Sequence, residues 1–178
     1  RNRWRRQQLA PELAAEIDQV VEVAYPQEQY AGLQRVVYLL NPDEPFVVDQ
    51  KVARTAEELG RLLDDEFSAL VDELANPHHS FYLYLEAHEA KAEAATFRKY
   101  YQTFSRKKAL NTIILELLGR HALTLGGTVF HSAEEVLRHP DKALLARMLK
   151  DGDSRLSLWI DGTAEDLIKR QLSMWRAL

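Results

Sequence analysis

Apolar residues recur at helical spacing over most of the chain. In residues 11–25 the apolar positions on one helix face are Leu13, Ile17, Val20, Val21 and Ala24. A second apolar run over residues 33–40 stops at the two prolines of the sequence NPDEP, because the residue before a proline is disfavoured in a helix. A longer stripe in residues 56–76 comprises Leu59, Leu62, Leu63, Phe67, Leu70, Val71 and Leu74. Residues 79–104 predict one long helix. Residues 105–120 predict another, with Ser105 as its cap and Gly119 near its end.

Two short segments depart from helical spacing and predict β-hairpins. In the first, residues 46–48 and 51–53 flank Asp49 and Gln50. The second is a strand, a two-glycine turn and a strand, with apolar residues Leu123, Leu125, Val129 and Phe130. Gly126 and Gly127 lie between the strands of the second hairpin, where a tight turn demands positive φ angles. A two-stranded ribbon is marginal alone, so the apolar side chains of the second hairpin are expected to lie on helices. We therefore interpret the glycine pair as a turn rather than as a ligand-binding loop.

Each hairpin is followed by a capping box, in which two side chains bond amides that the start of a helix leaves unpaired. Thr55 and Glu58 form the first box, and Ser132 and Glu135 form the second. When the chain is aligned with itself so that Thr55 matches Ser132, the upstream apolar positions also match without a gap: Phe46, Val48 and Val52 fall on Leu123, Leu125 and Val129. Downstream, with a gap of two residues, Leu74, Leu83 and Tyr84 fall on Leu149, Leu158 and Trp159. We therefore predict an internal duplication.

The predicted fold is mostly α (α+β). An N-terminal helix precedes two tandem related helical modules, each with a small β-hairpin before a capped helix. The predicted domains are a basic N-terminal tail and helix over residues 1–30, module 1 over residues 31–109 and module 2 over residues 110–178. Thr163 and Asp166 form a further cap-like pair, which predicts a last helix that closes module 2.

The composition limits the function classes. The chain has 178 residues, of which 46% are hydrophobic, enough for a packed core. A net charge of −4 argues against a dedicated nucleic-acid binder, which is usually basic. The absence of cysteine excludes disulfide and thiolate chemistry and fits a reducing cytosol, so we expect a cytoplasmic location. The chain begins at Arg1 without a methionine, so we expect a domain of a larger, bacterial multidomain protein.

No motif for catalysis, a cofactor or a metal is present, and no residues are predicted for these roles. The six histidines form no His-x-x-x-His pair, and neither a phosphate loop nor a G-x-S-x-G elbow occurs. An enzyme therefore remains only an alternative. It would need a deep pocket assembled from scattered residues such as Tyr84, Glu86, His88 and Arg98.

The segment FRKYYQTFSRKK, residues 97–108, alternates basic and aromatic residues. Such a segment either binds an anionic partner, protein or nucleic acid, or is a helix with an apolar aromatic face followed by a basic helix C-terminus, where cations are favourable. Tyr84 and Trp159 lie in the equivalent clusters SFYLYL and SLSLWI, which are expected to be core unless exposed as partner anchors. The candidate partner-binding residues are Arg98, Lys99, Tyr100, Tyr101, Arg106, Lys107, Lys108, Tyr84 and Trp159.

The leading hypothesis is a non-enzymatic helical scaffold or regulatory domain that binds a protein partner. The first alternative is a binder of nucleic acid or of an anionic membrane, through residues 98–108 or through the RNRWRR segment at residues 1–6. If a membrane helix preceded that segment, the chain would be the cytoplasmic part of a membrane-anchored protein.

Overall fold

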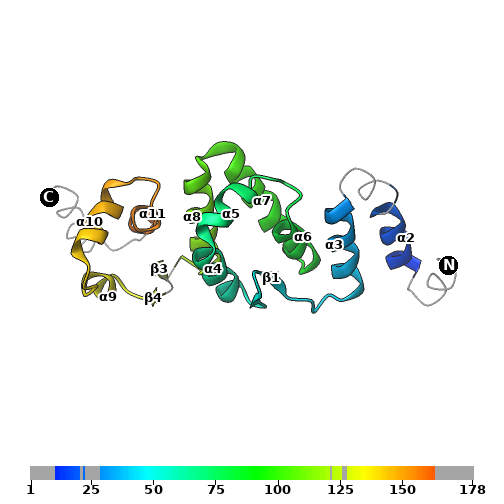
Figure 1. The fold of residues 1–178 in the computed structure, drawn as a ribbon, viewed down its shortest axis with the longest axis horizontal. Coiled ribbons are helices and arrows are strands. Elements are labelled where there is room, and N and C mark those ends of the chain that lie inside the picture. The colour runs from blue at the N-terminus through cyan, green and yellow to red at the C-terminus, as the bar shows by residue number, and fades with distance from the viewer. Residues whose placement is uncertain (1–10, 21, 23–28, 121, 126–127, 163–178) are drawn as a thin grey trace. The chain divides into compact units, whose positions relative to one another are not determined.

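The computed structural model describes residues 11–20, 22, 29–120, 122–125 and 128–162. Over these ranges helices predominate, and the two short antiparallel hairpins are the β-structure (Figure 1). The predicted mostly helical α+β class is confirmed. The chain divides into two compact units: unit 1 holds residues 1–45 and 76–96, and unit 2 holds residues 46–75 and 97–178. The predicted domain boundaries at residues 30 and 109 follow the duplication instead, and they stay a prediction.

Unit 1 is helical. Its elements are α2 (Pro11–Gln19), α3 (Gln29–Leu40), α6 (Ser80–Ala87) and the first part of α7 (Lys91–Thr103). Helix α3 contacts both α2 and α6. The core between α3 and α6 is aromatic, because Tyr38 meets Tyr84 edge to face with 5.7 Å between the ring centroids. Phe81 and Tyr82 of α6 are fully buried as well.

Unit 2 contains both hairpins and the remaining helices. Its elements are β1 (Phe46–Val48), β2 (Lys51–Ala53), α4 (Ala56–Asp65), α5 (Phe67–Glu73), the last part of α7, α8 (Arg106–Leu117), β3 (Leu123–Leu125), β4 (Thr128–Phe130), α9 (Ala133–Leu137), α10 (Lys142–Lys150) and α11 (Arg155–Gly162). Helix α8 contacts α4, α5 and α11 (Figure 1). Leu115, Leu123, Val136, Leu145 and Trp159 belong to one buried apolar cluster of this unit.

The two predicted hairpins are confirmed, and they have the same register. Phe46 pairs with Ala53 in the first, and Leu123 pairs with Phe130 in the second. In the first hairpin the turn residues Asp49 and Gln50 both have positive φ, 45° and 69°, as a two-residue primed turn requires. The predicted glycine turn of the second hairpin lies outside the described residues.

Both capped helices are confirmed, with one difference from the standard capping box. The Thr55 hydroxyl accepts a hydrogen bond from the Glu58 amide at 3.1 Å, but the Glu58 carboxylate accepts from the amide of Arg54 at 2.8 Å. The same pattern recurs in the second copy, where the Glu135 carboxylate accepts from the amide of His131 at 2.8 Å. Each glutamate therefore bonds the amide one residue before the cap, and so it ties the hairpin to the start of the helix.

The order of elements repeats at the predicted spacing. The number of residues from the start of α3 to the start of α8 is the same as the number from Thr55 to Ser132. The two hairpins are separated by this number of residues as well. The offset from the start of α6 to the start of α11 is shorter by two residues, which is the gap that the sequence predicted. The two residues that the second module lacks, relative to the first, fall between α9 and α10. There Pro140 follows a capped helix that has only 5 residues. The chain therefore contains two tandem modules, each with a helix, a hairpin, a capped helix and further helices.

The prediction of one long helix over residues 79–104 is wrong. Helix α6 ends at Ala87, and α7 begins at Lys91, because Glu89 adopts a left-handed conformation with φ 61°. The amide of Ala90 then donates to the Leu85 carbonyl at 2.9 Å, which closes the end of α6 as glycine-ended helices usually close. Helix α8 closes in the same way at Gly119, which has φ 71°, and the Arg120 amide donates to the Leu115 carbonyl at 2.8 Å; the sequence predicted a helix end near this glycine.

Two further predicted helices differ from the structure. The stripe in residues 56–76 forms two helices, α4 and α5, with Glu66 between them at φ −99° and ψ 21°. The N-terminal helix, predicted over residues 11–25, is described as α2 only to Gln19. The rest of that span lies largely outside the described residues, as do the basic segment 1–6 and the predicted last helix from Thr163.

Candidate functional site

The basic and aromatic segment of residues 97–108 forms the junction between α7 and α8. Helix α7 ends at Thr103, and the Ser105 hydroxyl caps α8 by accepting from the Lys108 amide at 3.2 Å. Tyr100, Phe104 and Lys108 are spaced four residues apart along this junction. The turn at the junction brings the three side chains together.

The three side chains are in direct contact. The rings of Tyr100 and Phe104 are stacked, with centroids 5.5 Å apart and planes inclined by 25°. The Lys108 ammonium lies 5.0 Å from the Phe104 centroid, within the range of a cation–π interaction. The stack therefore ends in a positive charge.

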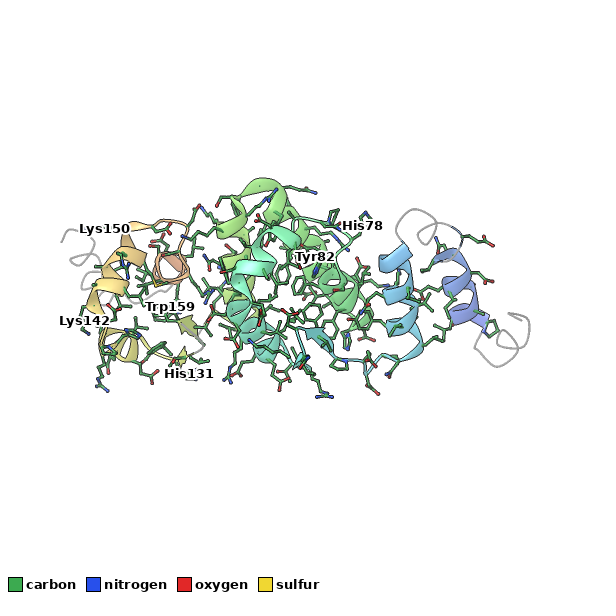
Figure 2. All side chains as sticks on the ribbon, viewed as in Figure 1. His78, Tyr82, His131, Lys142, Lys150 and Trp159 are labelled. Atoms are coloured by element: carbon green, nitrogen blue, oxygen red, sulfur yellow. The ribbon has the colours of Figure 1, made fainter. Side chains whose placement is uncertain are left out.

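This stack forms one wall of a hollow of about 340 Å³ in unit 2. The lining residues are Tyr100, Phe104, Lys108, Thr112, Leu115, Arg120, Leu158, Trp159 and Asp161. They come from the α7–α8 junction, from α8 and the turn after it, and from α11, which carries Trp159 (labelled in Figure 2). Three of the predicted partner-binding residues, Tyr100, Lys108 and Trp159, thus line one hollow.

A polar network borders the hollow. The Tyr100 hydroxyl donates to the Glu116 carboxylate at 2.6 Å, and Arg120 also donates to that carboxylate. Burial, together with the hydrogen bond to Glu116, raises the pKa of Tyr100 to about 12. The phenol therefore stays neutral at physiological pH, and the charge of Glu116 is balanced by Arg120.

Lys108 is the cation of this segment that faces the hollow without a carboxylate partner among the described residues. Arg106 and Lys107, in contrast, are both in ion pairs inside unit 2. Arg106 bonds Asp72 at 2.6 Å, and Lys107 bonds Asp151, which lowers the pKa of the Asp151 carboxyl.

Four other predicted candidates, Tyr84, Arg98, Lys99 and Tyr101, are not among the lining residues of the hollow. Lys99 is exposed on α7, whereas Arg98 and Tyr101 are half-buried. Tyr84 and Trp159 are each only 5% exposed, in agreement with their interpretation as equivalent core residues. The Trp159 side chain still contributes to the wall of the hollow.

Unit 1 has a second hollow of about 210 Å³. It is lined by Glu16, Arg35, Leu39, Leu83, Glu86, Ala87, Glu89 and Lys91. Tyr84 and His88, named above for the enzyme alternative, do not line it. The centroids of their two rings are 4.0 Å apart, and the His88 Nδ1 atom is 2.8 Å from the Tyr84 carbonyl oxygen. His88 therefore closes the end of α6, and of the named residues only Glu86 lines this hollow.

Several residues at the hollow were not among the predicted candidates. Phe104 was visible as an aromatic residue four positions after Tyr100, but its stacking depends on the turn at Ser105. Glu116 and Arg120 are spaced as a helical ion pair, which is common on any exposed helix and gave no signal. Asp161 and Leu158 reach the hollow because α11 lies against α8.

In the described ranges no three histidine or acidic side chains are grouped so that they could hold a metal ion. None of the helices described is long and apolar enough to cross a membrane. Comparison of the chain with models of known protein families, with curated proteins and with solved structures gave no match.

Proposed function

We propose that this chain is a non-enzymatic helical scaffold that binds a protein partner through the hollow of unit 2. The observation that supports this proposal is the convergence of Tyr100, Phe104, Lys108 and Trp159 on one open cavity. Aromatic side chains backed by a cation are typical anchors of protein interfaces. We further propose that the protein acts in the cytoplasm, as a domain of a larger multidomain protein.

The chemistry of the hollow defines the partner. Its volume of about 340 Å³ accommodates one or two side chains of a peptide segment. The Phe104 and Trp159 rings favour an aromatic or aliphatic anchor, and Lys108 favours a carboxylate beside it. The partner segment is therefore an apolar residue next to an acidic one.

A peptide selection tests this proposal. The full chain would be screened against a displayed library of random twelve-residue peptides, and the selected peptides would be titrated by isothermal calorimetry. Lys108→Glu should weaken their binding at least tenfold because it places a negative charge in the hollow. Phe104→Ala should weaken it similarly because it removes the stacked wall.

Lys99→Glu is the matched control, since it makes the same charge change at an exposed position on α7 outside the hollow. If the selected peptides bound Lys108→Glu and Lys99→Glu equally, the hollow would not be their site. If only single-stranded DNA or anionic vesicles bound, with an affinity that falls with salt, the anionic-partner alternative would replace the proposal.

A further inference from the structure

Helix α8 is covered on two faces within unit 2. Its Asn111 side chain donates to the Asp153 carbonyl at 2.8 Å, and Leu115 joins the cluster that contains Trp159, so this face lies against the α10–α11 region. The other face carries Leu110, Ile114 and Leu117 at positions i, i+4 and i+7. Leu110 and Ile114 are 0% exposed, and helices α4 and α5 contact α8.

Gly60 shows how closely α4 approaches this second face. A β-carbon at Gly60 would lie 3.1 Å from Leu118 Cγ and 3.4 Å from Leu117 Cβ. The neighbours of Gly60 on α4, Leu59, Leu62 and Leu63, are buried. The second face of α8 is therefore covered by a capped, leucine-bearing helix with a glycine at the point of close approach.

Helix α3 is the counterpart of α8 in the first module. In unit 1 it contacts α6 and α2, and these contacts leave its second face exposed. Tyr38 takes the place of Leu115 and contacts Tyr84, which takes the place of Trp159. The positions that match Leu110, Ile114 and Leu117 are Leu33, Val37 and Leu40. They are 55%, 37% and 50% exposed. The same three apolar positions are thus kept in both copies, but on α3 they face solvent.

The first hairpin, in unit 2, is likewise more exposed than its counterpart in the second module. Val47 and Val52, which pair across the strands, are 49% and 45% exposed. Thr124, the counterpart of Val47, is 0% exposed because β3 contacts α4 and α11. Together with the three residues of α3, these two valines are the exposed large hydrophobic side chains of the described part of the chain. All of them lie in the first module, on elements whose counterparts are covered.

The second copy of this chain is not the expected occupant of the α3 face. A head-to-tail contact would use α9 and α10, the counterparts of α4 and α5. Leu137 stands where Gly60 would be needed for close approach, and Pro140 stands in place of Leu63. In the described residues, α9 and α10 expose no large hydrophobic side chain.

We propose that the α3 face, defined by Leu33, Val37 and Leu40, binds a capped helix pair of the α4–α5 type on a separate protein partner. The partner helix carries leucines at positions i, i+3 and i+4 with a small residue between them, and it bears acidic residues on its outer side, as α4 does. This inference rests on the proposed scaffold function, and it adds a second binding surface with its own partner chemistry.

A peptide of residues 54–75, which contains α4 and α5 with their cap, serves as the probe. It would be labelled with fluorescein and titrated with the full chain by fluorescence anisotropy. We expect saturable binding to the wild-type chain and at least tenfold weaker binding to Val37→Glu. A peptide with Leu62→Ser and Leu63→Ser should not bind. Ala95→Glu, at an exposed position on α7 of the same unit, is the matched control and should bind like the wild type.

Two results would overturn this inference. If the peptide did not bind, the α3 face would not recognise an α4-type helix. If it bound Val37→Glu as well as wild type, it would be exchanging with the chain's own α4 and α5 on α8. Circular dichroism melts of each variant verify that the fold is intact, as expected for a change at a partly exposed site.

Sedimentation velocity tests whether a second copy of this chain, rather than a separate protein, occupies the α3 face. If the wild-type chain were a dimer that Val37→Glu dissociates, the α3 face would join two copies and the partner assignment would be wrong. The hollow is tested by other variants, Phe104→Ala and Lys108→Glu, with library peptides. If no library peptide bound at the hollow but peptide 54–75 still bound the chain, only the proposed function of the hollow would be contradicted.

Discussion

The guanidinium of Arg155 and the carboxylate of Asp64 form a buried ion pair that joins α11 to α4. The two side chains are 6% and 10% exposed. Arg155 also donates to the carbonyl and to the hydroxyl oxygen of Thr124, both at 2.8 Å, which adds β3 to the same contact. Burial lowers the pKa of the Arg155 guanidinium, whereas Asp64 beside it acts in the opposite direction. One residue thus connects the capped helix of the first module to the hairpin and last described helix of the second.

Removal of one partner of this pair should destabilise the protein strongly. Arg155→Met leaves the Asp64 carboxylate buried without its cation, so we expect a loss of about 3 kcal/mol in the free energy of unfolding. Urea denaturation followed by tryptophan fluorescence measures this loss. The double variant Asp64→Leu with Arg155→Met should recover much of it, because no buried charge then remains.

The exposed pair of Arg106 and Asp72 is the control for that experiment. Arg106→Met should change the free energy of unfolding by less than about 1 kcal/mol, because solvent screens exposed ion pairs. Equal losses in Arg155→Met and Arg106→Met would contradict the structural role assigned to the buried pair.

The two capped helices should respond alike to loss of their caps. Thr55→Ala and Ser132→Ala each remove one hydrogen bond to an otherwise unpaired helix amide. We expect each change to reduce the free energy of unfolding by about 1 kcal/mol. Thermal unfolding of both variants tests this expectation, and a large effect at only one site would show that the two joints are not equivalent.

Tyr100 should ionise at a pH well above the ordinary value for tyrosine. Its pKa, raised from 10.0 to about 12, means that the folded state keeps the phenolic proton over a pH range in which the unfolded state loses it. The resulting stabilisation is complete below pH 10 and is lost as the pH rises through about 12. Absorbance titration at about 295 nm, compared with Tyr100→Phe, isolates this step.

The variant Glu116→Gln provides a second test of the raised pKa of Tyr100. It removes the negative charge that opposes ionisation, so the pKa of Tyr100 should fall, although burial keeps it above the ordinary value. An unchanged titration curve would mean that the hydrogen bond to Glu116 is absent in solution.

Gly60 should tolerate only a small side chain. In Gly60→Ala the added methyl group meets flexible Leu118 atoms at 3.1 and 3.2 Å, and the gain in helix propensity of up to about 1 kcal/mol opposes this crowding. We expect little net change. Gly60→Leu, which copies Leu137 of the second module, should destabilise by about 2 kcal/mol or more because it forces α4 away from α8. Chemical denaturation of both variants distinguishes crowding from helix propensity.

Local sequence patterns were enough to predict the duplicated order of elements, the two hairpins and the caps at Thr55, Ser105 and Ser132. These features depend on residues within a few positions of one another, so their signals survive without any knowledge of distant neighbours. The breaks at Glu66 and Glu89 were not readable, because an ordinary side chain occupies the position where the backbone turns. The turn at Glu89 was missed because its left-handed conformation occurs at a residue other than glycine.

The surroundings of equivalent positions, in contrast, depend on packing between elements that are distant in the sequence. Leu33 and Leu110 are the same residue type at matching positions, yet Leu33 is 55% exposed, whereas Leu110 is fully buried on a helix that α4 and α5 contact. The pairing of Arg155 with Asp64 and the approach of Trp159 to Tyr100 also join residues that are far apart in the sequence. The repeating pattern sets which face of each helix is apolar, but contact between distant helices determines which of those faces stay open to a partner.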